Sequence, residues 1–396
     1  MQRSTARILT SHVGSLPRPT DLIAMHQGDT PADVLTARLT SAVRDVVREQ
    51  AEIGIDVVND GEFGKATRGP ADFGAWQSYA YRRLGGWTPG DPETSGVPSS
   101  PAGFKLGAIT NRRGWQQFGE FYQEYLTSAS FATAGPTPIF TGPITYTGQE
   151  AVAADIENLR AALSGVQVEG AFMTAVAPGS FARGRNAYYA SYEEFLFALA
   201  EALHEEYKAI VDAGYILQLD DPGLPDTWDM MVPAPTLEEY RRYATVCIDA
   251  ANRALRGLPE DRIRYHICWG SWHGPHTTDI PLRDVVDLLL RVRASAYSVE
   301  AANARHAHEW KVWRDVKLPE GKLLIPGVVS HATNVVEHPE VVADRILQFV
   351  SVVGRENVIA GTDCGLGGRV HPQIAWAKLD ALVAGARLAS KQLWGQ

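Results

Sequence analysis

The sequence predicts a single (β/α)8 barrel of the TIM type, and three observations point to it. Short apolar runs alternate with amphipathic stretches along most of the 396 residues, which is typical of parallel strands joined by helices. Nearly every apolar run ends at an acid, imidazole or thiol side chain, as expected where the carboxyl ends of barrel strands form a mouth. No Gly-x-Gly-x-x-Gly follows the first run, which disfavours an open doubly wound sheet.

Nine runs qualify as strands, one more than the barrel needs. In chain order they are residues 8–13, 55–59, 138–141, 171–176, 216–219, 263–268, 296–299, 323–329 and 358–361. One of them must be an accessory strand, and we expect it to be 171–176.

Four stretches repeat apolar residues at the 3.6-residue spacing of a helix with one buried face. They are residues 33–53, 238–255, 339–353 and 374–388. Cys247 lies on the second of these helices, and its simplest role is in the core.

Residues 65–136 break the alternation and are rich in Gly, Pro, Arg and aromatic side chains. The stretch is too long for an ordinary loop and too aromatic for a flexible linker. We expect it to be an ordered insertion after the second strand that forms a lid over the barrel mouth. The whole chain, 1–396, is then one barrel domain that carries this insertion.

Composition excludes several classes of protein. The formal charge of −9 offers no basic stripe for nucleic acid or an anionic membrane, and no run approaches the length of a membrane span. Three cysteines are too few for a disulfide framework, and no signal sequence begins the chain. We expect a cytoplasmic protein that acts on small molecules, and the sequence leaves a homo-oligomer open.

The polar groups at the strand ends are the candidates for function. Asp60 and Asp363 also suit helix capping, whereas Glu and His are poor caps. The candidates, in chain order, are His12, Ser15, Glu62, Asp220, Asp221, His266, Cys268, Glu300, His331 and Cys364.

Three of these residues suggest a metal site. His266 and Cys268 are two apart on one strand, so both side chains point the same way. With Cys364 they form an imidazole and thiolate set that suits Zn²⁺, and Glu300 is the best fourth ligand. The pairs His273/His276 and His306/His308 are rivals, but we expect His273, His276 and His306 to bond within loops or to contact substrate.

An ordered series of motifs resembles the catalytic barrel of cobalamin-independent methionine synthase. The motifs include Gly14-Ser15-Leu16-Pro17, Asp60-Gly61-Glu62, Gln218-Leu219-Asp220, His266-Ile267-Cys268, Val299-Glu300 and Thr362-Asp363-Cys364-Gly365-Leu366. The resemblance implies a (β/α)8 barrel with a zinc that activates a thiol, bound by His266, Cys268, Glu300 and Cys364. It also implies that His331 transfers a proton, that Glu62 and Asp220 contact an amino-acid substrate, and that Ser15 lies near its carboxylate.

The chain resembles the epoxyalkane:coenzyme M transferase branch of that superfamily more closely. The shared segments include Asp72-Phe73-Gly74-Ala75-Trp76, Arg305-His306-Ala307-His308-Glu309-Trp310 and the sequence from Cys364 to Arg369. The likeness runs nearly end to end but departs at Asp221 and at residues 302–304. The thiol or the electrophile could therefore differ from that of the branch.

The leading hypothesis is a transferase in which the zinc-bound thiolate of a small, coenzyme M-like thiol attacks an epoxide or a related electrophilic carbon. An anionic thiol would need an arginine, for which Arg183 and Arg369 are candidates. Two alternatives stay open. One is methyl transfer of the methionine synthase type, to homocysteine, and the other is a structural zinc in a barrel that only binds a ligand.

Overall fold

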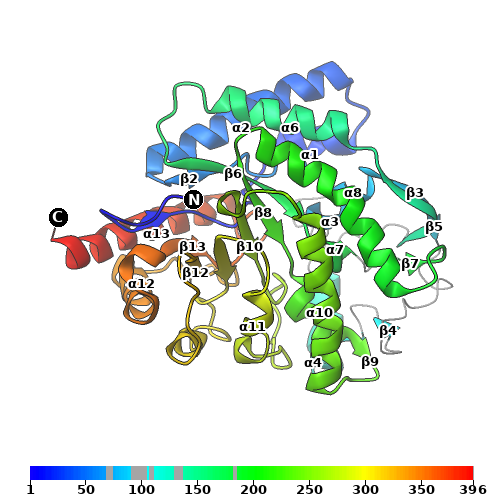
Figure 1. Cartoon of the computed structure of the whole chain (residues 1–396). Coiled ribbons are helices and arrows are strands. Elements are labelled where there is room, and N and C mark those ends of the chain that lie inside the picture. Colours follow the sequence, from blue (N-terminus) through cyan, green and yellow to red (C-terminus); the bar gives the residue numbers. More distant parts are fainter. Residues whose placement is uncertain (68–74, 91–104, 107–110, 129–136, 182–184, 396) are drawn as a thin grey trace.

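Eight parallel strands form the central sheet, as the sequence predicts (Figure 1). The computed structural model describes residues 1–67, 75–90, 105–106, 111–128, 137–181 and 185–395. The strand order is β1-β13-β12-β11-β10-β8-β6-β2. The backbone N–H of Asp56, next to β2, donates to the Thr10 carbonyl oxygen on β1 at 3.2 Å, so the sheet is nearly closed into a barrel. The strands are β1 Leu9–Thr10, β2 Val57–Val58, β6 Gly170–Val176, β8 Ile216–Asp220, β10 Ile263–His266, β11 Ala296–Val299, β12 Leu323–Val329 and β13 Ile359–Thr362.

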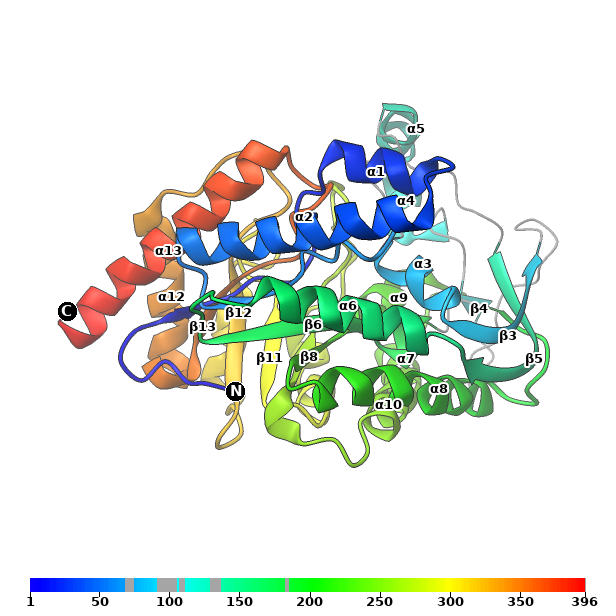
Figure 2. The same ribbon diagram turned by 90° about the horizontal axis from the view of Figure 1, so that it is seen from above.

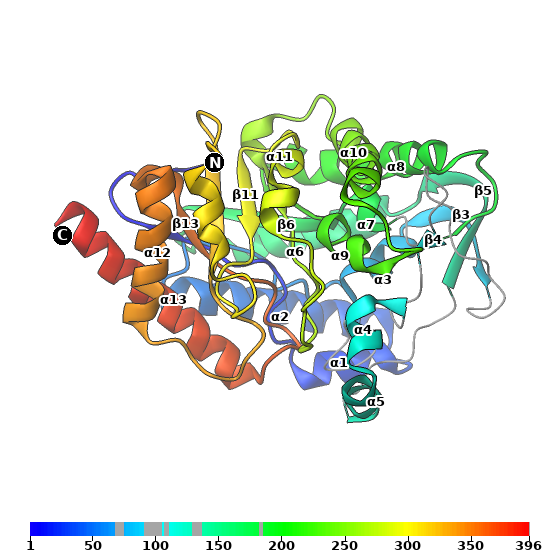
Figure 3. The same ribbon diagram turned by 90° about the horizontal axis from the view of Figure 1, so that it is seen from below.

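Helices surround this sheet (Figures 2 and 3). Helices α2 and α13, far apart in the sequence, lie in contact on one side of the barrel. The outer helices are α2 Ala32–Ile53, α6 Gln149–Ala162, α8 Tyr192–Asp212, α10 Leu237–Ala254, α11 Val286–Leu289, α12 Pro339–Val353 and α13 Pro372–Trp394. The four helices expected from the apolar spacing are confirmed as α2, α10, α12 and α13. Cys247 is a residue of α10 and is buried in the core, as expected. Burial raises the pKa of its thiol to about 12.

The accessory strand is not the one that the sequence suggested. Residues 171–176 belong to β6, which lies in the barrel between β2 and β8. The extra run is instead β5, Thr137–Tyr146, which pairs antiparallel with β3, Leu84–Gly90, and parallel with β7, Arg185–Asn186. Along β5, buried Phe140 and Tyr146 alternate with more exposed residues, whereas the last five residues of β6 are all buried. Alternating burial is typical of an antiparallel strand with one wet face, and continuous burial is typical of a parallel barrel strand.

The remaining elements belong to the segments of chain that connect the barrel strands and the outer helices. Within the expected insertion they are α3 Ala75–Tyr81, β4 Lys105–Leu106, α4 Arg113–Gln117 and α5 Gly119–Ser128. Elsewhere they are α1 Thr20–Gln27, α7 Pro178–Phe181, α9 Gly223–Met230, β9 Met231–Val232 and the 3₁₀ helices Glu260–Arg262, Leu282–Asp284, Glu309–Arg314 and Arg355–Asn357. Within the described ranges, no helix is long and apolar enough to cross a lipid bilayer.

Polar contacts inside the barrel tie opposite strands together. The Arg264 guanidinium on β10 donates to the Ser11 hydroxyl at 2.8 Å and to the His12 carbonyl oxygen at 2.6 Å, beyond the end of β1. It also lies over the Phe172 ring of β6, 3.5 Å from the centroid. Burial lowers the pKa of Arg264 to about 9. These contacts fix the strand ends that carry the candidate site.

Candidate metal centre and the cavities beside it

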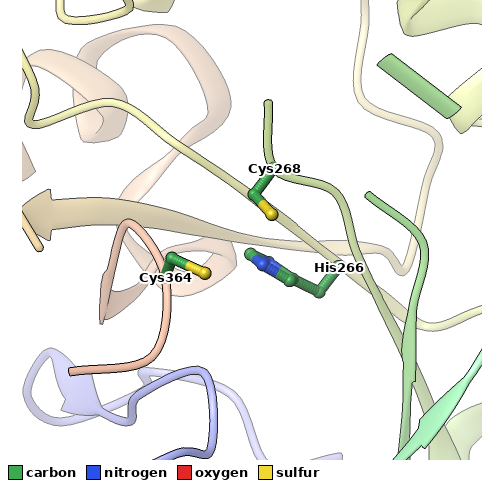
Figure 4. A group of neighbouring side chains, drawn as sticks. All are labelled: His266, Cys268 and Cys364. Carbon is green, nitrogen blue, oxygen red and sulfur yellow. The ribbon is translucent and has the colours of Figure 1, made fainter. Parts of the chain in front are cut away.

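His266, Cys268 and Cys364 converge in the structure, as the sequence predicts (Figure 4). His266 is the last residue of β10, Cys268 follows two residues later, and Cys364 follows β13. One ring nitrogen and the two sulfur atoms all lie within 4.8 Å of one another. His266 and Cys268 are buried, and Cys364 is partly exposed. Three donor atoms that approach so closely from two distant parts of the chain form a pre-arranged ligand set.

The neighbouring strand orients the His266 ring. His266 pairs in register with Ser298 on β11, and its Nδ1 lies 3.0 Å from the Ser298 hydroxyl oxygen. Its buried Nε2 finds no hydrogen-bond partner in the part of the chain that the structure describes. A hydrogen bond at one imidazole nitrogen is how proteins present the other nitrogen to a metal.

The two thiols lie close together and interact. That interaction raises the pKa of Cys268 and lowers the pKa of Cys364, which therefore has the more acidic thiol of the pair. One imidazole nitrogen with two sulfur atoms is a donor set that suits zinc better than magnesium or calcium, which prefer oxygen. The residues present therefore fit a zinc ion.

Glu300 lies beside this cluster but has other partners. Its Oε1 accepts a hydrogen bond from the Trp269 backbone N–H at 3.0 Å, and its Oε2 accepts one from Asn303 Nδ2 at 2.7 Å. Burial, together with nearby Asp363 and Cys364, raises the pKa of Glu300 well above its ordinary value. Among the described residues, the group whose donor atoms converge holds three members and not Glu300. Glu300 as the fourth ligand stays a prediction.

A small cavity of about 140 Å³ opens from the cluster. Four other residues expected at the site line it together with His266, Cys268 and Cys364, namely Ser15, Glu62, Asp220 and Arg369. Arg18, Arg112, Trp76 and Trp272 also line it. The Arg369 Nε donates to the Ser271 hydroxyl at 2.7 Å. We call this space the thiol-side cavity.

The two acids of the thiol-side cavity have different environments. The Glu62 Oε1 accepts from the Thr174 hydroxyl at 2.5 Å and pairs with the Lys65 ammonium at 3.2 Å. Burial alone would raise the pKa of Glu62, but Lys65, Thr174 and Arg18 hold it below its ordinary value. Among the described residues, the Asp220 carboxylate accepts from the Gln218 side-chain amide at 2.7 Å and not from a cation, and burial raises the pKa of Asp220 to about 7. At neutral pH Glu62 is therefore ionised, whereas Asp220 takes up a proton far more readily.

Glu300 and His331 line a second, wider cavity of about 720 Å³. It shares Gly270 and Trp272 with the thiol-side cavity, so the two spaces meet at the loop that follows Cys268. His331 is 2% exposed, and its Nδ1 has no hydrogen-bond partner among the described residues. Burial lowers the pKa of His331 to about 3, so its ring is neutral at physiological pH. We call this space the histidine-side cavity.

Two other candidates are engaged within the protein. The His12 Nε2 lies 2.8 Å from the Gln50 side-chain oxygen, and its Nδ1 accepts from the Gly14 N–H at 3.2 Å. The Asp221 carboxylate accepts from the hydroxyl groups of Ser180 and Tyr265, at 2.6 and 2.5 Å. Neither residue lines the described cavities, so their contacts favour support of the strand ends over contact with substrate. Arg183 lies outside the described residues.

The rival histidines bond within loops, as expected. Asp279 lies 3.0 Å from His276 Nδ1 and 3.1 Å from His306 Nε2, and Glu309 lies 2.9 Å from His306 Nδ1. Burial would lower the pKa of His306, but these two carboxylates raise it to about 10. His273 Nε2 lies 3.2 Å from the His331 carbonyl oxygen.

Described parts of the expected insertion pack against the loop between the two cavities. The Trp272 indole N–H donates to the Tyr122 hydroxyl at 3.0 Å, and the His273 N–H donates to the Tyr125 hydroxyl at 3.0 Å. The Arg112 guanidinium forms an ion pair with Asp226 on α9 and lies over the Trp272 ring. These contacts agree with a covering role, but much of 65–136 lies outside the described residues and the lid stays a prediction.

Sequence reasoning missed Ser298, Asn303 and Arg112. Ser298 lies two residues before Glu300 and so shares a face of its strand, which is a signal that periodicity offers. Nothing in the sequence indicated that β10 and β11 pair with His266 opposite Ser298. Asn303 contacts Asp363 and Arg112 contacts Asp226, each in a distant segment of the chain. Residue spacing does not predict such contacts.

Comparison with known proteins identifies relatives along nearly the whole chain. The chain is 25% identical over 420 residues to 2-hydroxypropyl-CoM lyase of Xanthobacter autotrophicus, covering 98% of this chain and 96% of that one. It is 26% identical over 394 residues to methionine synthase of Thermococcus kodakarensis, covering 97% and 94%. The structure of a B12-independent methionine synthase from Shewanella sp. W3-18-1, in complex with selenomethionine, superposes with a TM-score of 0.69 at 20% identity, covering 99% and 100%. At that identity the structural likeness establishes the barrel fold.

The model of the family described as "Cobalamin-independent synthase, Catalytic domain" matches residues 129–388. This range is well over half of the chain and contains the three converging ligands, Glu300 and His331. The relatives are enzymes, and so is this protein. The chain belongs to the cobalamin-independent synthase catalytic-domain family.

Proposed function

We propose that this enzyme is a zinc-dependent thiol S-alkyltransferase that joins a small thiol to an epoxide or a related electrophilic carbon. The observation that carries the proposal is the convergence of one imidazole and two thiol groups at the wall of a small cavity. His266, Cys268 and Cys364 would hold the zinc, with Glu300 as the fourth ligand. A zinc ion bound there would lower the pKa of a coordinated substrate thiol, so that the thiol reacts as a thiolate.

The thiol-side cavity suits a small thiol with a charged tail. Its volume of about 140 Å³ has room for roughly ten water-sized groups beside the cluster, which matches a small thiol. Arg369 lines the cavity, and its guanidinium is a cation that suits a sulfonate or carboxylate. Ser15 lines the same cavity and can donate its hydroxyl proton to such a group.

The histidine-side cavity suits the electrophile. His331 borders it with a buried Nδ1 that has no protein partner. Opening of an epoxide leaves an alkoxide oxygen, and a neutral imidazole can donate its N–H to that oxygen as negative charge develops. Entry from this side would place the electrophilic carbon across the shared Gly270 and Trp272 from the thiol.

A thiol panel separates this reaction from the main alternative. Zinc-loaded protein is incubated with 2-mercaptoethanesulfonate, 2-mercaptoethanol or homocysteine, together with either epoxypropane or methyltetrahydrofolate. We expect thioether formation from the epoxide, with the anionic 2-mercaptoethanesulfonate preferred over neutral 2-mercaptoethanol. Methionine formation without any consumption of epoxide would contradict the proposal.

Methyl transfer to homocysteine is the second candidate, and the two acids of the thiol-side cavity favour it. Glu62 and Asp220 line the cavity together and could receive the ammonium group of an amino acid. Against this, the Glu62 carboxylate already pairs with the Lys65 ammonium. The same thiol panel distinguishes the two functions, because homocysteine would be the only productive thiol if the enzyme transfers a methyl group.

A further inference from the structure

The Glu300 carboxylate has its own pair of hydrogen-bond donors, separate from the metal cluster. One is the Trp269 backbone N–H, 3.0 Å from Oε1, and the other is Asn303 Nδ2, 2.7 Å from Oε2. Each oxygen therefore has one donor. Hydrogen bonds to a carboxylate are stronger than those between neutral groups, so this pair offers Glu300 an alternative to coordination of a metal.

Both donors are held in place by contacts of their own. The Trp269 indole Nε1 donates to the Ile280 carbonyl oxygen at 2.7 Å, and its ring stacks on His306 with the centroids 4.0 Å apart. The Asn303 Oδ1 accepts from the backbone N–H groups of Arg305 and His306, each at 3.0 Å. That arrangement requires the amide nitrogen of Asn303 to point the other way, toward Glu300.

Asn303 also connects Glu300 to the segment that carries Cys364. Its Nδ2 lies 3.1 Å from Asp363 Oδ2, and its backbone N–H donates to the same oxygen at 2.8 Å. The Asp363 Oδ1 accepts from the backbone N–H groups of Ala301 and Ala302, at 2.7 and 2.8 Å. The loop after β11 is thereby fixed to the residue that precedes Cys364, with the Asn303 amide between the two carboxylates.

We propose that Asn303 is a positioning residue that receives and holds the Glu300 carboxylate when the substrate thiol displaces it from the fourth coordination position of the metal. The inference rests on the proposed function, because it requires a metal at His266, Cys268 and Cys364. Binding of the thiol to the metal and the hydrogen bond from Asn303 to Glu300 then favour the same state. When the thiol displaces Glu300, the released carboxylate gains the two hydrogen bonds instead of becoming an unpaired buried charge.

Loss of the Asn303 donor should shift two affinities in opposite directions. Without it, displacement of Glu300 leaves a buried carboxylate with one donor fewer, so the thiol should bind roughly 10-fold to 100-fold more weakly. Glu300 should at the same time coordinate the metal more readily, so the protein should hold the metal as tightly as before or more tightly. Damage to the loop would instead weaken both affinities.

The test compares Asn303→Ala and Asn303→Asp with wild type, and uses Asn334→Ala, an exposed asparagine, as the matched control. Co²⁺-substituted protein is titrated with 2-mercaptoethanesulfonate, 2-mercaptoethanol and homocysteine, and the visible absorption of the metal reports thiol binding. Zinc affinity is measured separately by competition with a chelator. The isosteric Asp keeps the Oδ1 acceptor but replaces the donor with a like charge, so its thiol affinity should fall at least as far as that of the alanine variant.

An unchanged thiol affinity in both variants overturns the inference. A parallel loss of zinc affinity and thiol affinity overturns it as well, since Asn303 would then only brace the loop. Neither measurement needs an electrophile, so failure of epoxide chemistry leaves this test intact. If the wild-type protein binds no zinc, the proposed function and this inference fail together at that first step.

Discussion

The thiol-side and histidine-side cavities meet at Gly270 and Trp272 but offer different chemistry. The first combines the three converging ligands with an ionised, lysine-paired Glu62 and with Arg369. The second combines a neutral His331 with Glu300, a carboxylate whose pKa burial raises. Groups suited to binding a metal and a charged thiol therefore lie on one side, and groups suited to proton transfer lie on the other. Changes on the two sides should accordingly affect different measurements.

The largest expected effect is loss of the metal from the thiol-side cavity. Cys364→Ala and His266→Ala each remove one of three converging donors, so zinc content should fall from about one ion per chain to near zero, and activity with it. Metal analysis of the purified variants measures this. Cys247→Ser is the matched control, because Cys247 lies on the core face of α10. This variant should keep its zinc. Full zinc in either ligand variant would refute the site.

On the histidine side, His331→Ala should slow turnover without loss of metal. Removal of a group that transfers a proton typically costs about 10²-fold to 10⁴-fold in kcat, and His331 is not one of the three converging residues. Zinc content, the Kd for thiol and kcat are measured on the same preparation. A variant that loses zinc and activity in proportion would show that the two sides are not separate.

In the thiol-side cavity, Glu62→Gln should lower the free energy of unfolding. The Lys65 ammonium, 3.2 Å from Glu62, is buried and would lose its ionised partner. Breaking a buried ion pair in this way costs about 3 kcal/mol of unfolding free energy, which urea denaturation can measure. The double variant Glu62→Gln with Lys65→Met removes both charges and should recover most of the loss. Equal instability of the single and double variants would argue against a structural ion pair.

The smallest expected effect is a change in pH dependence at Asp220. Because burial raises the pKa of Asp220 to about 7, from 3.8 in its ordinary state, the folded protein keeps a proton that the unfolded chain has released between those pH values. The stability from this group is present at acid pH and is lost as the pH rises through about 7. Asp220→Asn cannot ionise, so between pH 5 and pH 8 it should lose less stability than wild type, by roughly 1 kcal/mol or more. Parallel stability curves for the two proteins would exclude the raised pKa.

Part of this architecture could be predicted from residue periodicity and part could not. The 3.6-residue spacing of apolar side chains predicted α2, α10, α12 and α13, because a buried helical face imposes that period wherever it packs. The accessory strand was misassigned because runs of similar length and apolarity can pair either with a barrel strand or with a strand of a separate sheet. Only the pairing of β6 with β8, and of β5 with β3, distinguishes the two cases.

The sequence by itself determined the fold class and the identity of the converging ligands. Alternation of strands and helices without a Gly-x-Gly-x-x-Gly turn favours a parallel barrel, and parallel strands bring their carboxyl ends to one mouth, where His266, Cys268 and Cys364 meet. Tertiary structure alone decided what each residue contacts there. Ser298 opposite His266, Lys65 against Glu62, and Asn303 between Glu300 and Asp363 join segments whose distances depend on side-chain packing. Residue spacing along the chain fixes the direction of a side chain but not its partner across the barrel, and those partners set the pKa values and the division between the two cavities.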